Sequence, residues 1–429
     1  MVYRTVQRRS SKENVMNRWT KALAVVAAAS MLVPLSACGG DSDAGKTKLS
    51  FFANNTQTTY QKVIDEFEKQ NPDIVIDFST TTGAQSGYQQ TLQTRVSGGQ
   101  LADVYMVPPE ALSDLVKSGM VKDLTDEPFM EKIGESNKNA YSVDGKVYGM
   151  AISAYATVMA YNKDLLAQVG YDEIPATWDE FLDMCQKLQD AGITPYLEAK
   201  DRLGVPVESW LGYDSAQAGE SLDAKIDDGS ATFEEVYGPY FEEWYKIIDE
   251  GLMSSDVAGI SPDQTLSEFT SGRLAVMPSG PWYIADYENA KLNYGFGMIP
   301  MLNEGDTPYA PGYPDPAFGI NAKISGKELE AAEKFLTFLT SEEGLKAYQE
   351  GTGLIPNVEG YTASVDEAYQ SDYNLYIATG NVYLNSAHWT KGATALRNEI
   401  YTQLQQVATG SITPTEAAAN LDTKFETLS

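Results

Sequence analysis

The chain has 429 residues, of which 60 are acidic and 31 are basic, so its formal net charge at pH 7 is −29. This charge argues against nucleic acid as a partner, because binding to phosphates requires clustered lysine and arginine. A single histidine, His388, leaves little material for histidine-clustered metal sites or for hydrolysis with a histidine base. The length and the 43% apolar content suffice for two domains with full cores.

Residues 1–37 have the layout of a secretory signal peptide: a basic start, an apolar run over residues 22–35, and small residues. The apolar run is shorter than the roughly 20 residues that a membrane-spanning helix needs. Leu35-Ser36-Ala37-Cys38 resembles the bacterial lipoprotein signal, which implies that the Cys38 thiol is acylated and becomes the new N-terminus. The alternatives are a chance cysteine at this position and, for the start of the chain, Met16.

Strand and helix patterns alternate after a short polar tether. Strands are predicted at residues 48–52, 74–78 and 104–107, and a helix is predicted at residues 88–97. Another helix carries Tyr60, Val63, Ile64 and Phe67 on one face and ends at Asn71-Pro72. This alternation indicates βαβ units, hence a largely parallel sheet with helices on both faces.

The rest of the chain is more helical. Thr177 and Glu180 have the spacing of a capping box, and the helix that follows places Cys185 on its core face. Trp244 lies in a second apolar helix face, so we expect it to pack in the core. Strands are predicted at residues 274–277 and 294–299, and helices at residues 328–339 and 394–409. A last helix is expected to begin at Pro414, capped by Thr413.

Two tryptophans stand beside turn residues rather than in apolar helix faces. Trp282 follows a predicted strand and a Ser-Gly-Pro turn, and Trp389 directly precedes a long helix. An indole in such a place can project into a cleft and stack on the apolar face of a sugar, whose hydroxyls hydrogen-bond to polar side chains. The alternative is a half-buried structural tryptophan. Nucleotide-binding and serine-hydrolase motifs are absent from the sequence, whereas two carboxylates at glycosidase spacing could be present among so many acids.

The segment AISAYATVMAYNKDLLAQ, residues 151–168, contains a Tyr161-Asn162-Lys163-Asp164-Leu165 core. With TLSEFTSGRLAVMPSGPWYI, NYGFGMIP and LTSEEGLKAYQEGTGLIPNV, it resembles the family 1 solute-binding proteins of carbohydrate ABC importers, which include the maltose-binding proteins. The resemblance implies a two-lobed, hinged α/β fold of the periplasmic-binding-protein type II, with the ligand between the lobes. The implied segments are a signal peptide (1–37), a lipidated tether (38–47), lobe 1 (46–158 and 317–352) and lobe 2 (159–316 and 353–429).

The resemblance also implies a set of ligand-binding residues. Trp282 and Trp389 match the sugar-stacking aromatic residues, and Glu110 matches a carboxylate that binds hydroxyls, whereas Asp103 is expected to hold its loop. The other expected contacts come from the first strand-to-helix loop, the hinge, the Pro/Gly-rich connection and a helix: Asn55, Tyr155, Tyr313, Asp315 and Trp210.

The resulting hypothesis is a monomeric lipoprotein on the outer side of the cell membrane that captures a carbohydrate, an oligosaccharide in particular. It would deliver this ligand to the permease subunits of an ABC importer, without catalysis, cofactor or metal. One alternative is binding of a non-sugar solute such as a polyamine or peptide, and acids such as Glu110 and Asp315 would suit a polyamine. Another alternative is a surface glycosidase.

Overall fold

The computed structural model describes residues 45–81 and 85–428. Cys38, the predicted signal peptide and most of the predicted tether lie outside the described residues. Within the described part, the buried apolar side chains form two separate clusters, one around Phe51 and Phe335 and one around Trp178 and Trp244. We call the elements around the first cluster lobe 1 and those around the second lobe 2. Two separate cores confirm the predicted two-lobed α/β architecture.

Lobe 1 is built on a five-stranded sheet with the order β2-β1-β3-β13-β6. β1 pairs in parallel with β2 and β3, as predicted, whereas β13 pairs antiparallel with β3. The strands are β1 (Thr47–Ala53), β2 (Ile74–Thr80), β3 (Val104–Val107), β6 (Met150–Ala151) and β13 (Ala317–Ile320). The helices and short elements are α1 (Gln57–Gln70), α2 (Gln85–Gly98), α3 (Leu112–Lys117), α4 (Glu135–Ala140), α12 (Lys327–Leu339), α13 (Glu342–Thr352), the turns η1 (Pro109–Ala111) and η2 (Pro128–Lys132), and the hairpin β4 (Ser142–Val143) and β5 (Lys146–Val147).

The apolar face of α1 explains why this helix lies on the sheet. Tyr60, Val63, Ile64 and Phe67 are buried on it, which confirms the predicted face. The Tyr60 ring meets Phe51 of β1 edge-on at 5.2 Å. The predicted role of Asp103 is also confirmed, because its carboxylate accepts hydrogen bonds from the Ser50 amide and hydroxyl.

Lobe 2 contains a four-stranded sheet with the order β11-β8-β10-β9. Its strands are β8 (Val158–Asn162), β9 (Thr194–Tyr196), β10 (Leu274–Ser279) and β11 (Tyr294–Gly297). Its helices are α5 (Lys163–Gln168), α6 (Trp178–Asp190), α7 (Val205–Ala218), α8 (Leu222–Asp227), α9 (Phe233–Asp249), α10 (Pro262–Thr270), α11 (Ile284–Asn289), α14 (Gln370–Asp372), α15 (Ala393–Ala408) and α16 (Pro414–Glu426). Its short turns are η3 (Ser255–Ala258), η4 (Pro281–Tyr283), η5 (Glu367–Tyr369), the π-helical η6 (Tyr373–Ile377) and η7 (Asn385–His388).

The local predictions for lobe 2 are confirmed in the core and at the start of the last helix, whereas the capping box predicted at Thr177 does not form. Thr177 and Thr413 cap α6 and α16 through their hydroxyl oxygens, and of these two residues Thr413 alone is part of a full capping box. At Thr177 the Glu180 carboxylate instead accepts from the threonine hydroxyl. Cys185 and Trp244 are fully buried, as expected from their helix faces.

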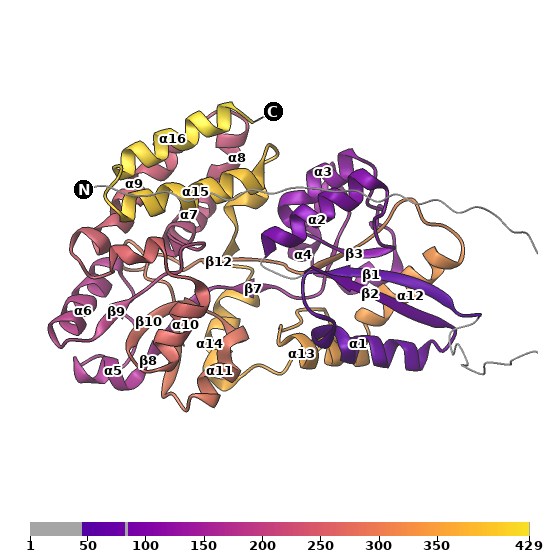
Figure 1. Cartoon of the computed structure of the whole chain (residues 1–429), viewed down its shortest axis with the longest axis horizontal. Helices are drawn as coiled ribbons and strands as arrows, with labels where there is room; N and C mark the ends of the chain where they lie inside the picture. Colours follow the sequence, from indigo (N-terminus) through magenta and orange to yellow (C-terminus); the bar gives the residue numbers. More distant parts are fainter. Residues whose placement is uncertain (1–44, 82–84, 429) are drawn as a thin grey trace, which may run out of the picture. The chain divides into compact units, whose positions relative to one another are not determined.

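Two strands carry the chain between the lobes: β7 (Tyr155–Ala156) and β12 (Ala310–Tyr313), which also pairs with β14 (Val382–Tyr383) (Figure 1). β7 and β12 are antiparallel, with Gly312 opposite Ala156. A Cβ atom at Gly312 would lie 2.2 Å from the Tyr155 carbonyl oxygen, so only glycine allows the strands to approach this closely. The residue numbers predicted for the lobe boundaries stay a prediction.

Candidate functional site

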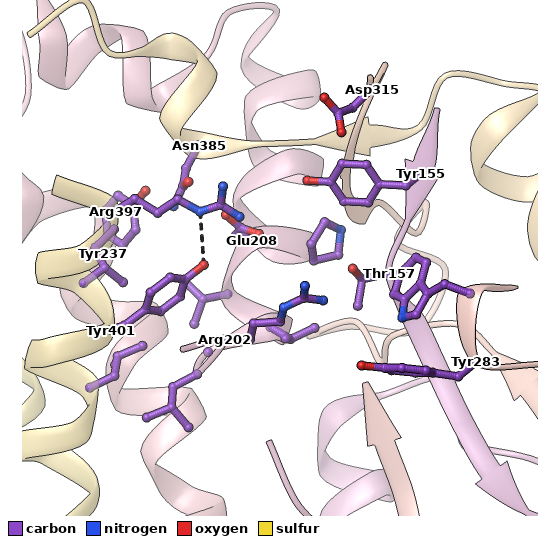
Figure 2. Close-up of a pocket in the computed structure, with 18 of the residues that line it drawn as sticks. Tyr155, Thr157, Arg202, Glu208, Tyr237, Tyr283, Asp315, Asn385, Arg397 and Tyr401 are labelled. Carbon is purple, nitrogen blue, oxygen red and sulfur yellow. Dashed lines mark hydrogen bonds between the residues drawn. The ribbon is translucent and has the colours of Figure 1, made fainter. Parts of the chain in front are cut away.

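A cavity of about 350 Å³ lies beside the strands that join the lobes. We call it the first cavity. Its lining includes Asn55 of lobe 1, Tyr155 and Asp315 of the crossing segments, and many residues of lobe 2. Figure 2 shows polar and aromatic side chains that surround this space, and those it labels come from segments between residues 155 and 401. The volume falls in the range of pockets that bind small molecules, roughly 300–1,000 Å³.

One wall of the first cavity is aromatic. Trp282 and Tyr283 belong to η4, which directly follows the buried strand β10. The indole of Trp282 folds back over Gly280, where an added Cβ atom would lie 2.2 Å from Cζ3 of the ring. Gly280 therefore leaves the space that the ring occupies. The ring is only partly buried, so one part of the indole stays available to a ligand.

Charged groups form another part of the lining. Arg202, Glu208, Asp315 and Arg397 all line the first cavity, so its formal positive and negative charges balance. In Figure 2 the two guanidinium groups point into the same space, and Glu208 lies beside Arg397. Such a lining offers strong hydrogen-bond donors and acceptors.

The local fold brings α7 and α15 close together and so places Glu208 near Arg397. α7 begins after Gly204, whose φ of +81° suits glycine. A Cβ atom at Gly204 would lie 2.7 Å from Leu404 Cδ1 of α15. The buried carboxylate of Glu198 accepts hydrogen bonds from the Gly204 and Val205 amides at 2.7 and 3.2 Å, which fixes the start of α7.

Two carboxyl groups of the first cavity have raised pKa values. Burial raises the pKa of Glu208 to about 7, although the nearby Arg397 guanidinium opposes the shift. Burial, and then the charge of Glu110, raise the pKa of Asp315 to about 7, and Arg397 again opposes the shift. Near neutral pH each carboxyl is therefore present in both forms. A protonated carboxyl donates a hydrogen bond and an ionised one only accepts. The cavity can therefore bind ligand groups that accept a hydrogen bond and ligand groups that donate one.

Arg397 is held on two sides. Its Nε donates to the Tyr401 hydroxyl one helical turn later at 3.1 Å, the bond drawn in Figure 2. Its Nη1 donates to Oε1 of Glu110 in lobe 1 at 2.7 Å. With two donors fixed, the guanidinium plane has a set orientation at the edge of the first cavity.

The eight residues predicted to bind ligand lie in three places. Asn55, Tyr155, Trp282 and Asp315 are brought together in the first cavity. Glu110, Tyr313 and Trp389 line a second cavity of about 660 Å³. Trp210 lies in the core of lobe 2, is 1% exposed, and donates from its indole nitrogen to the Pro300 carbonyl at 3.0 Å. That these eight residues contact a ligand remains a prediction.

Other groups of the protein already contact the three predicted residues at the second cavity. The Tyr313 hydroxyl donates to the Ala140 carbonyl, and the Glu110 carboxylate accepts from Arg397. Trp389 is 4% exposed and packs against Phe233, with 5.7 Å between the ring centroids. These side chains are therefore less available to a ligand than Trp282.

Sequence reasoning missed several residues of the first cavity, notably Arg202, Glu208, Arg397 and Tyr401. Arg397 and Tyr401 lie in a predicted helix with no feature that separates them from its solvent-facing residues. Glu208 is two residues from Trp210 and therefore lies on the other side of the same helix. Among residues 45–81 and 85–428, no group of three or more histidine, cysteine or acidic side chains is placed to hold a metal ion.

Comparison with known proteins places this geometry in a family. Residues 62–376 match the profile of the bacterial extracellular solute-binding proteins. The chain belongs to that family. A family 1 extracellular solute-binding protein from Bifidobacterium longum subsp. infantis has a similar structure, with a TM-score of 0.77 and 34% identity over 90% of this chain and 100% of the other. The predicted membership is confirmed, and the two lobes have the type II arrangement of the family.

Two curated relatives are named for what they bind. The multiple sugar-binding protein of Streptococcus mutans is 23% identical over 395 residues, covering 87% of this chain and 91% of the relative. A maltooligosaccharide ABC transporter solute-binding lipoprotein of Streptococcus pneumoniae R6 is 26% identical over 350 residues, covering 79% and 80%. Both relatives are binding proteins. Within the described ranges of this chain, no helix has the length and apolar character needed to cross a membrane.

Proposed function

We propose that the protein captures a carbohydrate, an oligosaccharide in particular, for import by an ABC transporter. The observation that carries this proposal is the partly exposed indole of Trp282 beside a cavity lined by balanced charged groups. An indole face matches the apolar face of a sugar ring, while Arg397 and Glu208 can donate to and accept from its hydroxyls. The names of the two curated relatives agree with this ligand class.

The same charges speak against the polyamine alternative. A polyamine needs an excess of acids, whereas Arg202 and Arg397 of the first cavity match Glu208 and Asp315 in number. The two arginines in the cavity would repel a cationic ligand once both are removed from water. A neutral polyhydroxylated ligand meets no such cost.

We further propose that residues 46–158 and 317–352 and residues 159–316 and 353–429 move as two bodies about β7 and β12. The separate cores of the lobes support rigid bodies of this kind, and Gly312 allows the joining strands to pack closely. Closure about a hinge would bury the ligand, and the cost of closure would keep binding reversible.

The remaining proposals concern where the protein acts. We propose that residues 1–37 are removed, that Cys38 is acylated, and that residues 38–47 tether a monomer to the outer side of the cell membrane. Permease subunits in that membrane would receive the ligand, and the protein itself would change no bond. The lipoprotein name of one relative and the extracellular family support this proposal.

The test is thermal unfolding of the full chain in mild detergent with raffinose, stachyose, maltotriose, glucose, spermidine and a tripeptide. A ligand at 100 times its Kd should stabilise the folded protein by about 2.7 kcal/mol. We expect at least one oligosaccharide to raise Tm and to be recovered intact by chromatography. A rise with spermidine or the tripeptide alone would contradict the ligand class, and shortened products would indicate a glycosidase.

A further inference from the structure

The carboxylate of Glu110 joins the two lobes although it lies in lobe 1. Its side chain is 1% exposed, and its Oε1 accepts from Arg397 Nη1 at 2.7 Å and from Ser386 Oγ at 3.2 Å. Both donors belong to lobe 2. Its Oε2 accepts from Gln89 Nε2 of lobe 1 at 3.1 Å. Protein donors therefore already hold both oxygens of this carboxylate.

A second contact between the lobes extends the network. The Thr394 hydroxyl of α15 donates to Gln89 Oε1 at 3.2 Å, and the amide of the same Gln89 donates to Glu110. Gln89 thus connects α15 to Glu110 through a second route. An ordinary Arg–Glu pair of this protein looks different: Arg273 and Glu268 both belong to lobe 2, and their side chains are 59% and 40% exposed.

The position of the pair relates it to the two cavities. Arg397 lines the first cavity, and Glu110 lines the second. The ion pair therefore lies between the two cavities, and the Ser386 hydroxyl donates to the same carboxylate oxygen. Any separation of the lobes at this point would break the Arg397 and Ser386 bonds together and return both charges to water.

The energetics of the Glu110–Arg397 ion pair favour a role for this pair in closing the two lobes. Closing the lobes removes both charges from water, and their short contact offsets that cost only when both partners are present. If one partner is removed, the other stays buried and unpaired in the closed form, whereas it is hydrated in an open form. The loss of either partner should therefore shift the protein toward the open form.

We propose that Glu110 is a positioning residue that holds Arg397 of the opposite lobe in the cleft, and that this pair sets how far the lobes close before any ligand enters. The closure part of the proposal does not rest on the proposed ligand class. The role of Arg397 at the ligand rests on the proposed function. Glu110 then acts on the ligand through Arg397 and not by direct contact.

The test measures the distance between the lobes without ligand. Spin labels are attached by non-cysteine chemistry at exposed positions 183 of α6 and 328 of α12 in the full chain. Pulsed electron resonance then gives the distance distribution for the wild type, Glu110→Gln and the control Glu268→Gln. We expect Glu110→Gln to raise the ratio of open to closed forms about tenfold or more. The control removes an Arg–Glu pair inside lobe 2 and should leave the distribution unchanged.

An unchanged distribution in Glu110→Gln would overturn the proposal. Should that variant fail to fold, Ser386→Ala removes one bond across the lobes and should give a smaller opening in the same direction. A double-mutant cycle with Arg397→Gln distinguishes coupling between Glu110 and Arg397 from a general loss of structure. Because the two residues act together, the double variant should open little more than either single variant, and additive opening would contradict the pair.

Glycan titrations of the same variants distinguish the two proposals. If the wild type binds an oligosaccharide, Glu110→Gln should weaken its affinity several-fold. If no carbohydrate binds but the lobes still open in Glu110→Gln, the ligand class is wrong and the interlobe pair stands. If a carbohydrate binds and the lobes do not open in Glu110→Gln, the proposed role of the interlobe pair is wrong and the ligand class stands.

Discussion

The segments that carry Trp282 and Trp389 are alike in sequence and different in structure. Each tryptophan follows a short turn of small or polar residues and precedes a helix. Trp282 lines the first cavity and remains partly exposed. Trp389 is 4% exposed and lies against Phe233 of α9.

The difference lies in what the rest of the chain brings to each indole. Phe233 begins α9, and its ring also meets Phe425 of α16, so Trp389 joins an aromatic cluster from distant segments. Trp282 has an aromatic neighbour only in Tyr283, at 6.2 Å, among the ring contacts of the described residues. The comparison teaches that tertiary partners, and not the local turn, decide whether such an indole serves the core or a cleft.

The largest expected effect is on stability at Trp389. Trp389→Ala should lower the free energy of unfolding by about 3–5 kcal/mol, because it removes a buried indole from an aromatic cluster. Trp282→Ala is the matched control and should change stability by less than about 1 kcal/mol, because its ring is partly exposed. Urea unfolding of both variants checks this. Equal losses at the two positions would abolish the distinction between the segments.

The opposite order is expected for ligand affinity. Trp282→Ala should weaken binding of the oligosaccharide found by thermal unfolding about tenfold to thirtyfold, because it removes the exposed stacking face. Trp282→Phe keeps a smaller flat ring and should lose less. Isothermal titration gives both Kd values, and an unaltered Kd in Trp282→Ala would mean that the ligand does not use this wall.

A pH experiment tests the polar lining of the first cavity, in which Trp282 also lies. The folded-state pKa of Glu208 is about 7, above its ordinary value of 4.5, so the folded protein holds the proton over a range where the unfolded chain has lost it. Between these values stability falls as pH rises. Glu208→Gln should reduce this slope by at most about 1.4 kcal/mol per pH unit. Denaturation of both proteins between pH 4.5 and pH 7.5 measures the slope. Identical slopes for the wild type and Glu208→Gln would refute the raised pKa of Glu208.

The smallest effect is expected at Gly280. Gly280→Ala places a methyl group where the Trp282 ring lies, so the ring must turn away while the backbone, which is extended at this residue, accepts alanine. We expect affinity to fall by about threefold with little change in Tm, since the indole remains but is displaced. A crystal structure of the variant with the ring unmoved would contradict the explanation.

Much of the fold could be predicted from the sequence because its strands and helices have strong local patterns. The apolar face of α1 and the capped start of α16 depend on residues a few positions apart. β13 shows the limit: it joins the lobe 1 sheet beside β3, from more than 200 positions later in the chain. No local pattern specifies that pairing, whereas the family resemblance implied that residues 317–352 return to lobe 1.

The site was less predictable for the same reason. Arg397 and Glu110 are 287 positions apart, and each is an ordinary charged residue of a helix or turn in its own segment. Only the packing of α15 against α7 and the approach of η1 turn Arg397 toward the first cavity. Trp282 was easier to find, because its strand-to-turn context limits where the side chain can go.

The unequal burial of the tryptophans has a spectroscopic consequence. Of the five tryptophans in the described residues, Trp178, Trp210, Trp244 and Trp389 are buried, and only Trp282 is partly exposed. Emission from the four buried indoles should be blue-shifted and insensitive to added quencher, whereas the Trp282 component should be red-shifted and accessible to iodide or acrylamide. The native protein thus contains its own optical reporter, so occupancy of the cleft can be followed by fluorescence without any attached dye.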